Sequence, residues 1–227
     1  MSITLPIQLP YLQKLSLILG KTLTFIDLET TGMVHEHNFS IIEIGLIHIS
    51  KDLVIQKSSL VNPHMKIPPY ISEITNIYDH MVSDKKDFSH FSSYVGKIAK
   101  NNIMCGYNSK TFDSKGMEKM LRKYSIDETF KNQLDFRHIF LRCRKNFDGI
   151  LGQSGNLTQA CAHHGIVIAG DAHRAAYDIA ITALLAEKLL EKYGFGIIHK
   201  DMEKFDDSKS KGLYYNHIVG QKIKIIS

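Results

Sequence analysis

Residues 23–32 have the sequence Leu-Thr-Phe-Ile-Asp-Leu-Glu-Thr-Thr-Gly, and this stretch decides the fold. Apolar and β-branched residues fill its first half, which favours a buried central strand over an edge strand carrying two solvated acids. Side chains alternate between the two faces of a strand, so Asp27 and Glu29 share one face while Ile26 and Leu28 point into a core. The Thr-Thr-Gly that follows ends the strand and places both acids at its carboxyl end.

The two acids need a neutralising partner. Carboxylates on one face repel each other, and residues 23–32 contain no lysine or arginine. The simplest neutraliser is a divalent metal ion held by oxygen ligands. Asp27 and Glu29 are therefore candidate metal ligands.

Length and composition indicate one large domain with a sizeable core. The chain has 227 residues, a formal net charge of +5 and three widely separated cysteines, which favour reduced core thiols over a disulfide framework or a zinc site. No apolar run is long enough to cross a bilayer and the first residues lack a signal-peptide pattern, so we expect a soluble, cytoplasmic protein. The positive charge suits a phosphate-binding surface if the lysines cluster.

The rest of the chain alternates between strand and helix patterns. Residues 41–49 and 53–61 are apolar strands joined by a short turn, so the first three strands are expected to form an antiparallel meander. Residues 11–19 have a helical apolar spacing that Gly20 ends, and this helix is expected to pack on the domain, with partner docking as the alternative. Further expected elements are helices at 72–78, 88–100, 114–124, 134–144, 157–164 and 170–193, and a short strand at 103–108.

Three more candidate residues stand at the starts of expected helices. Asp113 immediately precedes one helix, where an acid is usually an N-cap, although a cap and a metal contact can coexist on two carboxylate oxygens. His173 and Asp178 are five residues apart at the entry of the longest helix. Most single histidines at such positions are surface residues. Both side chains can nevertheless reach one site if His173 lies in the entry and Asp178 in the second turn.

Four features follow one another along the chain: Asp27-x-Glu29-Thr30-Thr31-Gly32, the segment from Asn108 to Phe112-Asp113, Asp135, and His173-Arg174-Ala175-x-x-Asp178. In this order and at these intervals they resemble the DEDDh branch of the DnaQ-like 3′→5′ exonucleases, over residues 22–193. The first block is similar to the proofreading subunit of bacterial replicative polymerases, and later blocks to exodeoxyribonuclease X and exonuclease I. Two departures stand out: three residues instead of two separate Asn108 from Phe112, and Asn76 stands where glycine is usual.

The resemblance implies an α/β fold with a ribonuclease H-like mixed central sheet, whose first three strands are antiparallel and whose faces are flanked by helices. It implies two Mg²⁺ or Mn²⁺ ions about 3.5 to 4 Å apart. Asp27 would bridge both ions, Glu29 and Asp178 would hold one, and Asp113 would reach the other. His173 would be the general base. The residues expected to hold the substrate are Thr30, Thr31, Gly32, Met33, Asn108 and Phe112.

The expected activity is metal-dependent hydrolysis of phosphodiester bonds at the 3′ ends of single-stranded DNA, releasing nucleoside 5′-monophosphates, as in DNA replication or repair. Two alternatives stay open: an RNA 3′ exonuclease of the RNase T or oligoribonuclease kind, because the same residues serve both, and a polymerase-associated nucleic-acid-binding module. A polymerase or clamp is a candidate protein partner, and no membrane is expected to take part. The chain would divide into an N-terminal extension at 1–20, an exonuclease domain at 21–194 and a C-terminal tail at 195–227.

Overall fold

A five-stranded sheet in the order β3-β2-β1-β4-β5 forms the centre of the molecule. The computed structural model describes residues 8–150, 155–168 and 174–223, with side chains described as far as residue 218. The strands are β1 Leu23–Thr30, β2 Ile41–Ile49, β3 Val54–Leu60, β4 Ile103–Gly106 and β5 Gln133–Asp135. β1 pairs antiparallel with β2 and parallel with β4, so it is the central strand that the sequence predicted. The mixed sheet and its antiparallel β1-β2-β3 meander confirm the expected fold class.

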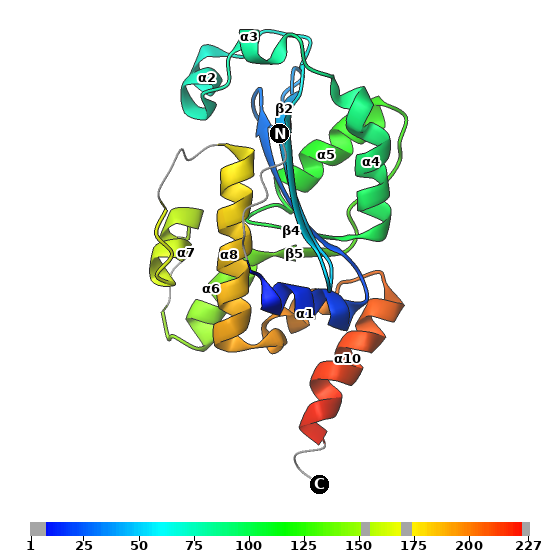
Figure 1. Cartoon of the computed structure of the whole chain (residues 1–227), viewed down its shortest axis with the longest axis vertical. Helices are drawn as coiled ribbons and strands as arrows, with labels where there is room; N and C mark the ends of the chain where they lie inside the picture. Colours follow the sequence, from blue (N-terminus) through cyan, green and yellow to red (C-terminus); the bar gives the residue numbers. More distant parts are fainter. Residues whose placement is uncertain (1–7, 151–154, 169–173, 224–227) are drawn as a thin grey trace.

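Helices cover both faces of this sheet (Figure 1). One layer contains α1 (Pro10–Leu19), α6 (Phe136–Asn146), α7 (Leu157–His163) and α8 (Ala175–Tyr193), and the other contains α4 (Phe88–Asn101) and α5 (Asp113–Lys123). The side chains of β1 alternate between these layers, because Phe25 belongs to the core under α8 whereas Ile26 and Leu28 belong to the core under α4 and α5. Asp27 and Glu29 share the face of Phe25 and therefore point toward the α8 layer.

β5 is a correction to the sequence-based expectation of a helix from residue 134 to 144. Residues 133–135 pair in parallel with β4, and α6 begins only at Phe136. Three residues are too few to show an alternating pattern, so their pairing in the folded sheet decides their conformation. Asp135 ends β5 and caps α6, because its carboxylate accepts a hydrogen bond from the Arg137 N–H at 3.1 Å.

The helix expected at residues 72–78 begins and ends earlier. The chain instead forms α2 (Pro69–Thr75) and then the short helix α3 (Asp79–Val82). Pro69 takes the first helical position, where the missing N–H of proline has no intrahelical partner to lose. Asn76 ends α2 in the left-handed conformation with a φ of 54°. Asparagine tolerates this conformation better than most residues, which accounts for its place where glycine is usual.

The N-terminal helix α1 is part of the core. Leu12 and Leu19 are buried in the same cluster as the apolar residues of α8. The N–H groups of Tyr11 and Leu12 donate to the Glu187 carboxylate of α8 at 2.8 and 2.9 Å, so α8 supplies the cap that α1 lacks in its own sequence. Gly20 ends the helix with a φ of 65°, as predicted. The apolar face of α1 thus packs on the domain.

The chain after α8 folds back against the domain. The short helices η1 (Phe195–Ile198) and α9 (His199–Met202) bury Ile198 and Met202 in the same core cluster as α8. α10 (Ser208–Ile223) contacts α1 and then projects from the body of the molecule (Figure 1). Among the described residues, no helix combines the length and the apolar character that crossing a bilayer requires.

Candidate active site

Three carboxylates meet at the carboxyl end of β1. Oxygen atoms of Asp27, Glu29 and Asp178 all lie within 4.8 Å of one another. Asp27 and Glu29 project from β1, and Asp178 projects from the first turn of α8. The structure therefore brings together three of the residues that the sequence singled out, across about 150 residues of chain. Carboxylate oxygens grouped in this way form a ligand set that suits a hard divalent cation.

Asp113 approaches this cluster from α5. It is the first residue of the helix, and Phe112 occupies the N-cap position, so the interpretation of Asp113 as the cap is wrong. Its Oδ1 instead accepts a hydrogen bond from the Leu28 N–H at 3.1 Å. Because Leu28 lies between Asp27 and Glu29 on β1, this bond fixes a fourth, buried carboxylate beside the cluster.

Burial and mutual repulsion favour the protonated forms of these acids. Burial, followed by the Asp113 and Glu29 carboxylates, holds the pKa of Asp27 well above its ordinary value. Burial, followed by Asp178 and Glu43, raises the pKa of Glu29 to about 8. Burial also raises the pKa of Asp113 to about 7. A divalent cation would displace these protons and offset the repulsion, so the residues present fit a metal site.

A buried glutamate on β2 fixes the start of α8. Glu43 is 1% exposed, and its carboxylate accepts hydrogen bonds from Nε and Nη2 of Arg174 and from the Ala175 N–H, each at 3.1 Å. These contacts satisfy a first-turn N–H group of α8 and set the position at which the helix enters the domain. Asp178 lies in the same first turn, so Glu43 helps to set where its carboxylate meets β1.

Two further contacts let α8 come close to the sheet. At Gly45 of β2, a Cβ atom would stand only 2.6 Å from the carbonyl oxygen of Ala175, so this position accepts no larger residue without moving the helix. On the neighbouring strand β3, Gln56 donates from Nε2 to the carbonyl oxygen of Ala176 at 2.6 Å. The first turn of α8 is therefore held by both strands.

Four of the predicted substrate residues lie at the end of β1 and in the loop after it, namely Thr30 in the strand and Thr31, Gly32 and Met33 in the loop. The threonine hydroxyls serve the loop itself, because Thr30 donates to the Gly32 carbonyl at 2.9 Å and Thr31 donates to the Asn38 carbonyl at 3.0 Å. The Met33 N–H donates to Oε1 of Glu36 at 2.9 Å. The side chain of Met33 is 51% exposed whereas the other three residues are buried. Met33 is thus the member of this group whose side chain faces outward.

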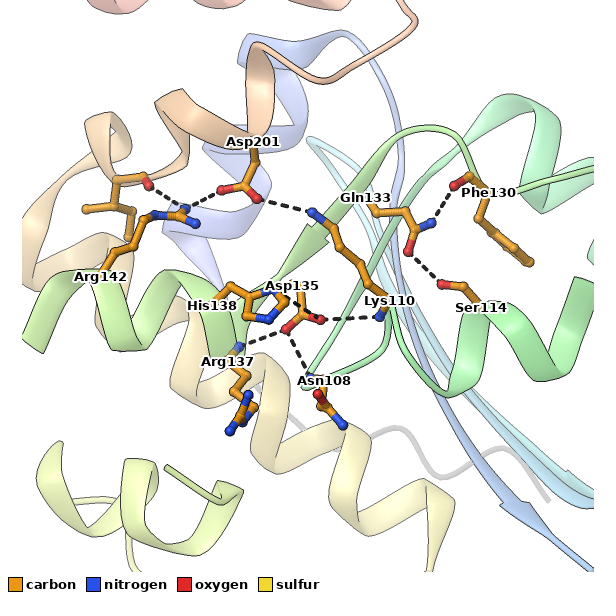
Figure 2. A network of polar contacts seen from close by, with 11 residues as sticks. Asn108, Lys110, Ser114, Phe130, Gln133, Asp135, Arg137, His138, Arg142 and Asp201 are labelled. Carbon is orange, nitrogen blue, oxygen red and sulfur yellow. Dashed lines mark hydrogen bonds and ion pairs between the residues drawn. The ribbon is translucent and has the colours of Figure 1, made fainter. Parts of the chain in front are cut away.

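A second loop, residues 107–112, joins β4 to α5, so it carries Asn108 and Phe112 and leads directly into Asp113. Figure 2 shows Asn108 and Lys110 of this loop beside Asp135. The fully buried Asp135 accepts hydrogen bonds from the N–H of Asn108 at 3.0 Å and from the N–H of Lys110 at 3.2 Å. Asn108 adopts a left-handed backbone with a φ of 62° at this bend. Asp135 therefore shapes this loop through its main chain, and it lies outside the carboxylate cluster.

His173 lies outside the described residues, so its role as the general base stays a prediction. Its neighbour Arg174 is held by Glu43. The sequence-based reasoning missed Glu43 and Gln56, and it assigned no role to Asp135. An acid within an otherwise apolar strand, as in residues 41–47, is the signal that could have revealed Glu43.

Comparison with known proteins agrees with this geometry. The sequence profile of the RNase T family, described as "Exonuclease", matches residues 24–186. A protein described as 3′-5′ exonuclease DinG from Staphylococcus epidermidis is 28% identical over 206 residues, which are 89% of this chain and 22% of that protein. The chain spans about a fifth of the length of the curated relatives that it matches.

Solved structures share the fold. Exonuclease X in complex with 5′-overhanging duplex DNA matches with a TM-score of 0.55 at 22% identity, over 76% of this chain and 93% of that one. A moderately thermophilic exonuclease I from Methylocaldum szegediense matches with a TM-score of 0.63 at 18% identity, over 79% of this chain and 42% of that one. At these identities the likeness concerns the fold alone.

Proposed function

Because this chain belongs to the RNase T family of DnaQ-like 3′→5′ exonucleases, of the DEDD type, we propose that it removes nucleoside 5′-monophosphates from the 3′ ends of single-stranded DNA. One observation carries the proposal: the oxygen atoms of Asp27, Glu29 and Asp178 converge within 4.8 Å. Acids that raise one another's pKa are characteristic of functional sites, because they weaken the fold unless a ligand binds among them.

The family is typically metal-dependent, and the acidic cluster of this chain fits that chemistry. We assign two Mg²⁺ or Mn²⁺ ions to the site, held by Asp27, Glu29, Asp178 and Asp113. When bound, such ions lower the pKa of water and stabilise negative charge on the leaving 3′ oxygen. The chain contributes the rigidity: β1 carries Asp27 and Glu29, and the Leu28 N–H fixes Asp113.

His173 is the proposed general base. A neutral imidazole near pH 7 can accept a proton from the attacking water. Its position in the chain supports this role, because Arg174 directly follows it and is held by Glu43 next to the cluster. Glu43 therefore anchors Arg174, the sequence neighbour of His173, and the first turn of α8, which carries Asp178.

The substrate end is proposed to meet the two loops that flank the acids. Met33 offers an exposed apolar side chain on which a base can stack. Asn108 and Phe112 lie on the loop that leads into Asp113. Stacking and phosphate contacts of this kind give binding that is independent of sequence. The matching structure of exonuclease X contains 5′-overhanging duplex DNA, and the proposal carries DNA over to this chain as the substrate class.

The test is a digestion of matched single-stranded DNA and RNA oligonucleotides labelled at the 5′ end, with Mg²⁺ or with EDTA. We expect a ladder of DNA products that shorten from the 3′ end, only with Mg²⁺, and release of 5′-monophosphates. Asp27→Asn should abolish the ladder. Asp52→Asn is the matched control, because Asp52 is an exposed acid paired only with the surface residue Lys51.

Three outcomes would contradict the proposal: digestion that continues in EDTA, internal cleavage, or full activity of Asp27→Asn. Faster digestion of RNA than of DNA would favour the RNA exonuclease alternative over the DNA exonuclease proposed here. Contact with the 2′-hydroxyl is what lets an exonuclease distinguish RNA from DNA. An oligonucleotide blocked by a 3′-phosphate completes the design, because resistance of this substrate shows that attack starts at a free 3′ end.

A further inference from the structure

The loop at residues 107–112 is held by a side chain as well as by its main chain. Nζ of Lys110 donates to Oδ1 of Asp201 at 3.2 Å, across 91 residues of sequence. Figure 2 shows Lys110 reaching from the loop to Asp201 on α9, with Arg142 of α6 contacting Asp201 from the other side. We call these three side chains the tail bridge.

Asp201 is buried, and the tail bridge supplies its charge partners. The residue is only 3% exposed, and a buried carboxylate is costly unless cations and hydrogen bonds satisfy it. Lys110 and Arg142 provide two cations. Arg142 also donates from Nη2 to the carbonyl oxygen of Ile197 at 3.2 Å, so it ties α6 to η1 as well as to α9. Lys110 is the member of the bridge that belongs to the loop.

The segment that provides Asp201 follows the part of the chain that matches the exonuclease family. The match covers residues 24–186, whereas η1 and α9 occupy 195–202. Ile198 and Met202, on the same short stretch as Asp201, are fully buried. The core therefore fixes α9 in place, and Lys110 is anchored to a rigid support.

We propose that the tail bridge makes Lys110 and Asp201 positioning residues for substrate binding. The bridge holds the loop so that Asn108 and Phe112 meet the 3′-terminal nucleotide, and in this it rests on the proposed function. Asp113, the next residue after the loop, has an anchor of its own in the Leu28 N–H. Loss of the bridge therefore raises KM for the substrate and leaves kcat nearly unchanged.

A direct contact between Lys110 and a substrate phosphate is the competing explanation. The two explanations predict opposite effects for a neutral residue at position 201. If Asp201 positions the loop through Lys110, Asp201→Asn weakens substrate binding. If Lys110 instead bound phosphate, Asp201→Asn would release its ammonium group and strengthen substrate binding, most of all at low salt.

The experiment compares steady-state kinetics of the full chain and its variants on a single-stranded DNA oligonucleotide with Mg²⁺. Lys110→Met and Asp201→Asn should each raise KM by about fivefold with kcat changed less than about twofold, and the double variant should be no worse than either. Lys110→Arg should restore binding. Lys131→Met is the matched control, because it removes the same charge from a lysine on the surface. Lys131 pairs with the exposed Asp206 of the tail at 3.1 Å.

Hydrogen exchange provides a readout that is independent of activity. Peptides that contain residues 107–112 should exchange faster in Lys110→Met than in Lys131→Met. An unchanged KM and unchanged exchange in Lys110→Met would overturn the proposal, as would a lower KM in Asp201→Asn. An inactive wild-type chain would instead refute the proposed function, and the exchange measurement would still decide whether the bridge holds the loop.

Discussion

Replacing Glu43 by glutamine tests whether β2 controls the acid cluster through α8. The substitution keeps the shape of the side chain but removes the negative charge that faces Arg174. It also turns the NH₂ group of the new glutamine toward the N–H donors of Arg174. Breaking a buried ion pair costs about 3 to 5 kcal/mol, and because Arg174 is about one-third exposed we discount this to about 2 to 3 kcal/mol. With an unfolding entropy of about 0.5 kcal/mol/K for 227 residues, Tm should fall by about 4 to 6 °C.

Stability alone would not show that Glu43 serves the active site, so activity is the second readout. Displacement of Asp178 should lower kcat/KM by about tenfold to a hundredfold. Glu43 is also one of the charges that raise the pKa of Glu29, so its removal lowers that pKa and moves the acid limb of the pH profile of kcat/KM to lower pH.

Glu118→Gln is the matched control for this prediction. Glu118 of α5 is also a buried carboxylate, and it accepts the Phe130 N–H at 3.1 Å and Nζ of Lys115 at 3.3 Å. Its substitution should lower Tm and leave the pH profile in place. The reasoning is refuted if Glu43→Gln loses no more activity than Glu118→Gln at equal Tm, or if its acid limb moves to higher pH.

Three further predictions follow from the same contacts. The pKa of Glu29 is raised to about 8 and that of Asp113 to about 7, so the metal-free folded protein holds protons that the unfolded chain has released between about pH 4 and 8. Its unfolding free energy should therefore fall as pH rises through this window. Calorimetry should find that adding Mg²⁺ raises Tm more at pH 8 than at pH 6. Equal rises of Tm at the two pH values would contradict this prediction. Gly45→Ala places a Cβ at 2.6 Å from the Ala175 carbonyl oxygen and should push the first turn of α8, with Asp178, away from β2. Calorimetric titration should therefore find weaker Mn²⁺ binding. Unchanged affinity would show that the site tolerates this movement of α8. Glu187→Ala removes the acceptor of two α1 N–H groups, so it should lower the unfolding free energy by about 1 to 2 kcal/mol while activity is retained. Limited proteolysis should then cut α1 faster than in the wild type, and unchanged protection of α1 would argue against this cap.

The central strand could be predicted from the sequence because its signal is local. Alternation with a period of two placed Asp27 and Glu29 on one face, and the structure has them on the α8 side of β1. Residues 31–40 connect β1 to β2 and residues 50–53 connect β2 to β3. Both connections are shorter than the crossover that parallel neighbours need, so the antiparallel meander follows from them. Asp178 was linked to this strand only through the resemblance, since no local pattern brings residues 150 positions apart into contact.

What the sequence could not provide are contacts whose two partners are far apart in the chain. Glu43 gains its role only when Arg174 packs against β2, and 131 residues separate the two. Asp135 looked like the start of a helix, and it does cap α6, but the same carboxylate also binds the loop of Asn108 and Lys110. The tail carried no recognisable motif, because Asp201 acts through its burial and its cations and not through a sequence pattern.

The buried and half-buried carboxylates discussed above differ in what surrounds them. Glu43 and Asp135 accept hydrogen bonds from N–H donors of the chain, so their burial stabilises the fold directly. Asp27 and Glu29 instead face other carboxylates, which raise the pKa of both. Mutually repelling acids contribute stability only when a cation binds among them. Burial by itself therefore does not mark the candidate active site. The sign of the neighbouring charges does, and it is why this packing of α8 on β1 fits a metal site.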